Sequence, residues 1–294
     1  MRKGIQTVIV GGVLALLSAC SQPAIPTPTT DSMAQMVQIG PGDTPAAIEQ
    51  SYGGHVVVWQ PEAQTAILEV AAGHTQGLTT AAQHSEVIAS EPNTNAILVP
   101  EHNHDTPGLS TQGWTAWSGG YTAWSGGYTA WSGGWTAWSG GTAEGSESPN
   151  REAWQQIGLY DTDGLAPHYG AGITVAVIDT GIDLRHPMFQ GHLAPGHDFV
   201  DDDPEPQEVP APEGQRSGYG HGTAVAGIIL QVAPNATILP LRVLRPDGSG
   251  DLTAVIAAID WAMNAGVDVI NLSLGAQRHS PSLQFMIDQA TQEG

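Results

Sequence analysis

Two residues of this 294-residue sequence have the types and surroundings that proton-transfer chemistry requires. Asp179 directly follows the apolar run 173–178, and His221 lies between Gly220 and Gly222 at the start of an Ala/Gly-rich segment. The apolar run predicts a buried strand of a parallel sheet, and the segment from residue 223 predicts a helix. In α/β proteins, active sites form where strands end and helices begin. A lone histidine is more often a core residue, but together with Asp179 it could form an acid–base pair.

Three motifs, in this order, resemble the signatures of the subtilisin-like serine proteases. Asp179-Thr-Gly-Ile-Asp and His221-Gly-Thr-Ala-Val-Ala-Gly resemble the segments of the catalytic aspartate and histidine, and residues 269–275 resemble the substrate-binding strand. The resemblance implies that His221 is the general base and that Asp179 fixes its tautomer. It implies a serine endopeptidase acting on protein or peptide substrates, with no required cofactor. The residues implied to bind the substrate backbone as an added strand are Ser273, Leu274 and Gly275.

The resemblance also calls for two residues that the sequence does not contain. The family's nucleophile lies in a Gly-Thr-Ser-x-Ala motif, and its oxyanion asparagine lies in an Ala-Gly-Asn turn. We therefore expect residues 150–294 to be the N-terminal part of a catalytic domain, inactive alone, whose last strand, 267–274, has an uncovered edge. The alternative is a non-catalytic surface lipoprotein that binds proteins or glycans through its N-terminal domain and repeats.

The first 20 residues predict export. Arg2 and Lys3 precede an apolar run, 8–17, that is too short to span a bilayer. Leu17-Ser-Ala-Cys20 resembles the lipobox of bacterial lipoproteins, which implies that Cys20 is lipidated and becomes the first residue of the mature chain. The expected location is the cell envelope or the extracellular space, with membrane contact through the lipid anchor alone. The alternative is an ordinary cleavage site beside an incidental cysteine.

Charge limits the classes of partner. Acidic residues outnumber Lys and Arg by 29 to 8, and the net charge is −21. This balance argues against nucleic acid and anionic lipid surfaces as partners. The run Asp201, Asp202 and Asp203 could ligate calcium through its carboxylates, and a solvated acidic loop is the alternative.

The segments before residue 150 differ in composition. Residues 21–35 are rich in Pro and Thr and predict a tether. Residues 36–105 predict a small α+β domain with a helix at 44–52 and strands at 55–59 and 65–70. Its position, with Glu91-Pro-Asn93 near its end, resembles the prodomain of the same family, which implies a folding aid and an inhibitor that binds its own catalytic unit.

Residues 106–149 contain four tandem seven-residue units, at 114–141, of the form Trp/Tyr-Thr-Ala-Trp-Ser-Gly-Gly. The Gly-Gly pair in every unit excludes a coiled coil, because glycine strongly disfavours helix. The composition predicts a semi-flexible linker. The regularly spaced aromatic residues leave a surface for glycans or self-association as the alternative.

Residues 150–294 alternate between strand and helix patterns. Strands are predicted at 173–178, 236–243 and 267–274, and helices at 251–265, with Asp251 as N-cap, and at 281–293. This order predicts an α/β fold with a partial, doubly wound parallel sheet, preceded by the small α+β prodomain.

Overall fold

The computed structural model describes residues 32–72, 86–93, 97–98, 155, 168–212, 218–276 and 279–294. The chain divides into two compact units. The first unit combines the chain up to Ile97 with residues 250–265 and 276–294, and the second combines residues 98–249 with 266–275. The predicted signal peptide, the lipidation residue Cys20 and the repeats at 114–141 lie outside the described residues.

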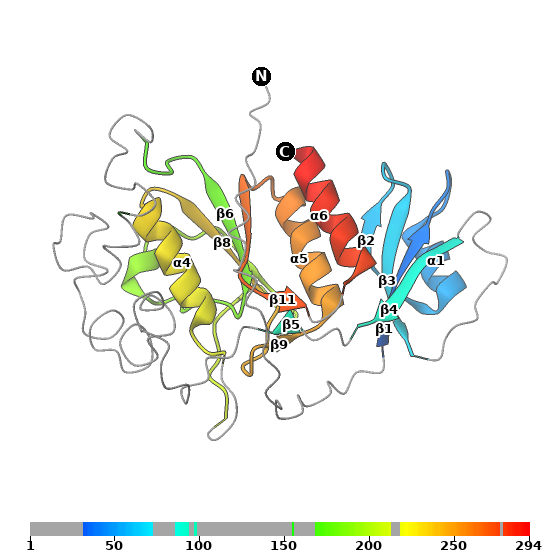
Figure 1. Ribbon diagram of the computed structural model, residues 1–294, viewed down its shortest axis with the longest axis horizontal. Coiled ribbons are helices and arrows are strands. Elements are labelled where there is room, and N and C mark those ends of the chain that lie inside the picture. Colours follow the sequence, from blue (N-terminus) through cyan, green and yellow to red (C-terminus); the bar gives the residue numbers. More distant parts are fainter. Residues whose placement is uncertain are drawn as a thin grey trace. The chain divides into compact units, whose positions relative to one another are not determined.

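An antiparallel sheet forms the centre of the first unit (Figure 1). It consists of β1 (Ser32–Gln38), β2 (Gly54–Gln60), β3 (Thr65–Ala71) and β4 (Glu86–Pro92), in the order β2-β3-β1-β4. β2 and β3 lie where the alternating sequence predicts strands. β1 begins at Ser32, inside the range assigned to the tether, so the folded part begins before the predicted boundary at residue 36.

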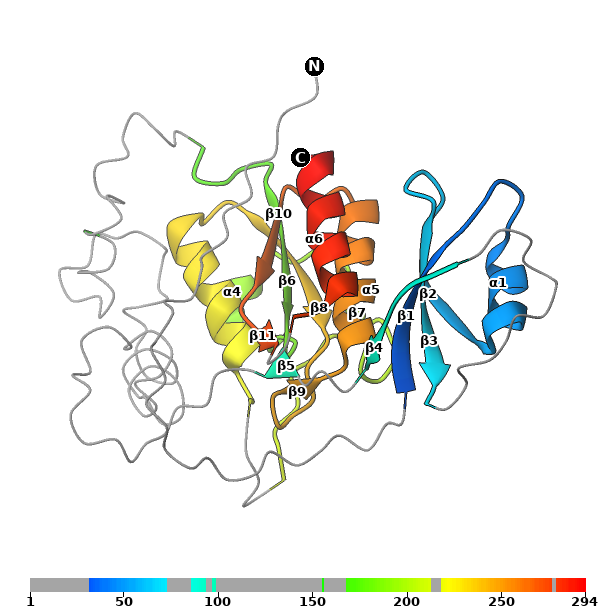
Figure 2. The ribbon, with the colours of Figure 1, turned by 45° about the vertical axis from the view of Figure 1, so that its right-hand side comes forward.

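Helices cover both faces of this sheet (Figure 2). α1 (Pro45–Tyr52) lies on one face and buries Ile48 against Val37 and Leu68. α5 (Leu252–Asn264) and α6 (Pro281–Glu293) lie on the other face, as contacts of α5 with β2 and of α6 with β1 indicate. Two apolar faces explain why consecutive residues of β3 are buried, rather than alternate ones.

The end of β4 supplies hydrogen-bond acceptors to the first turns of α5 and α6. Asn93 O accepts from Leu252 N (3.2 Å) and Asn93 Oδ1 accepts from Thr253 N (2.9 Å). Glu91 Oε1 accepts from Ser282 N (3.0 Å). The first amides of a helix have no partner within the helix, so these bonds satisfy groups that would otherwise be buried unpaired. Asp251 occupies the predicted N-cap position of α5, but its side chain makes no capping bond, and Asn93 fills that role instead.

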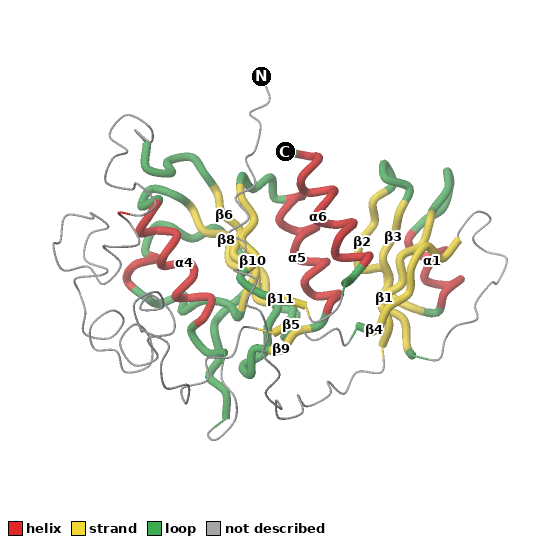
Figure 3. Tube along the Cα trace, viewed as in Figure 1, coloured by secondary structure: helices red, strands yellow, loops and turns green. Residues whose placement is uncertain are grey.

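The second unit is built on a parallel sheet (Figure 3). It contains β6 (Thr174–Asp179), β7 (His197–Asp198), β8 (Thr237–Arg242) and β10 (Val269–Leu272), in the order β10-β6-β8-β7. The parallel pairing confirms the predicted α/β class. β10 is shorter than the predicted strand 267–274, and it lies half-buried at one edge of the sheet.

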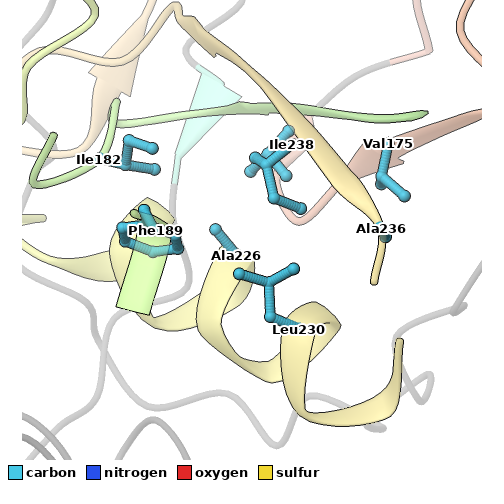
Figure 4. Close-up of a cluster of buried hydrophobic side chains, with 8 residues drawn as sticks. Val175, Ile182, Phe189, Ala226, Leu230, Ala236 and Ile238 are labelled. Carbon is cyan, nitrogen blue, oxygen red and sulfur yellow. The ribbon is translucent and has the colours of Figure 1, made fainter. Parts of the chain in front are cut away.

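One helix packs on β6 and β8 and thereby positions the catalytic candidates. α4 (His221–Val232) places Ala226 and Leu230 against Val175 of β6 and Ile238 of β8 (Figure 4). Phe189, from the short 3₁₀ helix η3 (Pro187–Phe189), completes this cluster. Because β6 ends at Asp179 and α4 begins at His221, this packing brings the end of the strand to the start of the helix.

Three two-residue strands form a further sheet in the order β11-β5-β9: β5 (Ile97–Leu98), β9 (Ser249–Gly250) and β11 (Gly275–Ala276). Among the described residues, no helix is both long enough and apolar enough to cross a membrane.

Replacing Asn93 by alanine should destabilise the first unit by about 1–3 kcal/mol, the cost of unpaired buried polar groups. Asn93 is 1% exposed, and its side chain also donates to Ser32 Oγ and Glu69 Oε1, both at 3.0 Å. Urea unfolding followed by circular dichroism measures the effect.

The matched control is Asn264→Ala, because Asn264 is exposed and bonds only across one helical turn, to Asp260. Equal unfolding midpoints for the two variants would show that the Asn93 bonds do not stabilise the unit.

Candidate active site

The structure brings Asp179 and His221 together. His221 Nδ1 lies 2.6 Å from Asp179 Oδ1. Asp179 is fully buried and His221 is 4% exposed. A charge-assisted bond of this length in a buried site orients the imidazole ring.

A close approach of backbones makes this contact possible. A Cβ on Gly222 would lie 2.1 Å from Gly181 O and 3.2 Å from the Cβ of Asp179. Only glycine fits at position 222, because any side chain would push α4 away from the end of β6. Gly220, the residue before His221, has a φ of 88°, which glycine adopts without strain. The local backbone geometry therefore explains why glycine occurs on both sides of His221.

A second buried acid, Glu208, lies beside the pair. It is 4% exposed and accepts hydrogen bonds from the Thr180 and Thr223 hydroxyls and from Gly222 N at 3.2 Å. Burial, with a contribution from the charge of Asp179, raises the pKa of Glu208 to about 8. The sequence gives no local signal for this residue, which is one of several acids in a Pro-rich loop. The only indication is the threonine that follows each catalytic candidate, since a buried hydroxyl needs an acceptor.

The three aspartates considered for calcium have separate partners. Asp201 Oδ2 accepts from Arg242 (2.6 Å), Asp203 Oδ1 accepts from Glu205 N (2.7 Å), and the side chain of Asp202 is 97% exposed. Within the described ranges, no three His, Cys, Asp or Glu side chains converge on a site that could hold a metal ion.

Arg242 explains the arrangement of this acidic loop. It ends β8, is 3% exposed, and pairs with the buried Asp198 as well as with Asp201. Asp198 in turn accepts from Val200 N and Asp201 N. Part of the acidic run therefore neutralises a buried cation, and the run is not simply a solvated loop.

The candidate substrate-binding residues follow β10. Leu272 is paired with Ile178 in the parallel register, so Ser273 continues the chain at the same end of the sheet as Asp179. Ser273 Oγ donates to Asn271 Oδ1 (2.9 Å), and Leu274 is half-buried. Gly275 begins β11, and a Cβ built there meets no atom within 4 Å. Open space at this glycine is compatible with a neighbouring substrate side chain.

Comparison with known proteins finds one protein family that resembles part of this chain. The model of the subtilase family, Peptidase_S8, matches residues 170–294. Residues 170–294, the subtilase segment, are therefore similar to this family. This segment contains Asp179, His221 and residues 273–275.

The relatives of this chain are longer proteins. Minor extracellular protease Vpr of Bacillus subtilis (strain 168) is 42% identical over 148 residues, which cover 47% of this chain and 18% of Vpr. Thermitase of Thermoactinomyces vulgaris is 39% identical over 135 residues, which cover 42% of this chain and 45% of thermitase. The chain therefore spans less than half the length of either relative.

A solved structure extends the likeness in fold. Fervidolysin from Fervidobacterium pennivorans, a keratinolytic enzyme related to subtilisin, matches with a TM-score of 0.51 at 20% sequence identity. The match covers 90% of this chain and 39% of that chain. The shared fold therefore reaches beyond the subtilase segment, which begins at residue 170.

The free energy of unfolding should fall with increasing pH because of Glu208. Its pKa is about 8 in the folded chain against an ordinary value of 4.5, so the folded state holds a proton that the unfolded state releases. The stability is fully present below pH 4.5 and is lost as the pH rises through about 8. Glu208→Gln, which does not titrate, should lose less stability between about pH 6 and about pH 9 than the wild type. Urea unfolding at the two pH values tests this.

Glu205→Gln is the control for a carboxylate of the same loop, because Glu205 is exposed. It should follow the wild type. A pH dependence of Glu208→Gln identical to that of the wild type would contradict the raised pKa of Glu208.

Proposed function

We propose that this chain is part of an exported subtilisin-like serine endopeptidase, with Asp179 and His221 as the acid–base pair of its triad. The observation that supports the proposal is the 2.6 Å contact between His221 Nδ1 and Asp179 Oδ1 in a buried site of a subtilase segment. Nε2 of His221 would take the proton of the nucleophile and pass it to the leaving amine. Asp179 would hold the Nδ1–H tautomer and stabilise the imidazolium that forms.

The nucleophile would come from outside these 294 residues, since they contain no Gly-Thr-Ser-x-Ala motif. Loss of the nucleophile lowers the turnover of such a triad by about a millionfold, and a missing oxyanion donor lowers it further. The 294 residues alone are therefore proposed to be inactive. Ser273 is not the nucleophile in this proposal: its hydroxyl bonds to Asn271 of the same strand end.

Protein or peptide substrates would bind along Ser273, Leu274 and Gly275. An extended peptide can add to an exposed strand through main-chain hydrogen bonds, with pockets for alternate side chains. β10 at the edge of its sheet and the open space around Gly275 support this role.

The N-terminal α+β domain is proposed to be a prodomain that aids folding and inhibits the enzyme. Support comes from Glu91 and Asn93, which supply acceptors to the first turns of α6 and α5. Both helices belong to the subtilase segment, so this domain stabilises secondary structure that the segment needs. The fold likeness to fervidolysin over 90% of this chain agrees with such an arrangement.

Export and lipid anchoring at Cys20 complete the proposal and rest on the sequence alone. The apolar run and the Leu17-Ser-Ala-Cys20 motif support processing as a lipoprotein, with the Pro-rich segment after Cys20 as a tether. The folded part would then be held at the cell envelope by acyl chains.

A fluorophosphonate probe, which reacts with activated serines, tests the proteolytic function. The 294-residue chain should remain unlabelled. The product of the reading frame continued past codon 294 should be labelled at a serine of a Gly-Thr-Ser-x-Ala motif, and His221→Ala should abolish that labelling. Label on a serine of the shorter chain, or no such motif downstream, would contradict the proposal, and the second result would favour the non-catalytic alternative.

Replacing Cys20 by serine tests the anchor. In a host that processes lipoproteins, the wild type should incorporate a radiolabelled fatty acid and fractionate with membranes, and Cys20→Ser should do neither. Membrane association of Cys20→Ser equal to that of the wild type would contradict lipidation at this residue.

A further inference from the structure

Glu208 is a buried acid that the proposed proton transfer does not use. It comes from the loop between β7 and α4, and backbone bonds fix this loop against the segment after Asp179. Glu208 N donates to Ile182 O and Ile182 N donates to Pro206 O, both at 3.0 Å. The Glu208 side chain is thereby directed to the place where β6 ends and α4 begins.

The Glu208 carboxyl joins the two segments that carry the catalytic candidates. Its Oε1 accepts from the Thr180 hydroxyl and from Gly222 N at 3.2 Å, and its Oε2 accepts from the Thr223 hydroxyl. Thr180 directly follows Asp179, and Gly222 and Thr223 directly follow His221. One carboxyl therefore holds the residues next to both members of the pair.

The hydrogen bonds of the two threonines make Glu208 difficult to replace. Thr180 Oγ1 accepts from Gly222 N (2.9 Å), and Thr223 Oγ1 accepts from Asp183 N (2.8 Å). Each hydroxyl has one proton to donate, and in both cases the carboxyl of Glu208 receives it. Thr180 is 3% exposed and Thr223 is fully buried, so bulk water does not reach these hydroxyls. Removal of the carboxyl would leave two buried donors unpaired.

One more bond connects this network to the pair itself. Thr180 N donates to Asp179 Oδ1 at 2.7 Å, and the same oxygen lies 2.6 Å from His221 Nδ1. A shift of Thr180 therefore moves a group that helps to orient the Asp179 carboxylate. A shift of Gly222 or Thr223 moves the first turn of α4, which carries His221.

We propose that Glu208 is a positioning residue for the Asp179–His221 pair: its carboxyl fixes the turn after β6 to the first turn of α4 and so sets the distance between carboxylate and imidazole. The inference rests on the proposed function, in which this pair transfers the proton. Glu208 acts through Thr180, Gly222 and Thr223, and not on a reacting atom.

Nuclear magnetic resonance of the full chain, labelled with ¹⁵N-histidine, tests the inference. The readout is the proton bound to Nδ1 of His221, assigned by its absence in His221→Gln. The wild type should show this proton, held by the bond to Asp179. In Glu208→Ala, exchange of the proton with water should become at least about tenfold faster, because loss of a buried hydrogen-bond network of this kind corresponds to more than about 1.4 kcal/mol.

Two matched variants separate position from ionisation. Glu208→Gln keeps an acceptor for Thr180 and Gly222 and should retain most of the protection, whereas it removes the group that titrates near pH 8. Glu205→Gln removes a carboxylate from the same loop and should behave as the wild type.

An unchanged exchange rate in folded Glu208→Ala would overturn the inference. If that variant does not fold, Thr223→Val decides, because it removes one threonine of the network and keeps the branched shape. Faster exchange supports the inference, and wild-type exchange overturns it. No substrate is used, so failure here leaves the proteolytic function standing, and failure of the fluorophosphonate test leaves this result standing.

Discussion

The close approach of Gly222 to the end of β6 is the constraint on which the candidate active site depends. Gly222 packs against Gly181 O and the side chain of Asp179 at distances that leave no room for a Cβ. This approach lets α4 start beside the strand end, so that His221 reaches Asp179 through a 2.6 Å contact. The core of α4, β6 and β8 holds the two backbones in place, and Glu208 joins their ends.

Buried acids have three different roles around this constraint. Asp179 faces an imidazole, Asp198 faces the guanidinium of Arg242, and Glu208 faces hydroxyls and a backbone amide. An ionised carboxylate is stable in a buried site when a cation faces it, whereas burial raises the pKa of Glu208 to about 8 despite its hydrogen bonds. Among the acids that produce the net charge of −21, a few are buried with specific partners and many are solvated.

The sequence predicts the strands and helices of this site better than the hydrogen bonds that join them. The strand before Asp179, the helix after His221 and the helix over 281–293 follow from local apolar patterns, and their bounds in the structure agree closely. The juxtaposition of Asp179 and His221 is expected because active sites of α/β proteins form where strands end and helices begin. Glu208 and Asn93 could not be found in this way. The partners of the Glu208 side chain lie 14 to 28 residues away, and those of the Asn93 side chain lie 24 to 160 residues away. Nothing in the local sequence distinguishes the two residues from other polar loop residues.

The effect of Gly222→Ala on the Nδ1-bound proton of His221 tests the central claim most directly. Alanine within a helix is favoured over glycine by about 1 kcal/mol, so a loss cannot come from weaker helix formation. The proton should be protected in the wild type and in Gly275→Ala, whose site has open space, and its resonance should be lost in Gly222→Ala. A protected proton in Gly222→Ala, equal to that of the wild type, would contradict the claim that this glycine contact sets the pair.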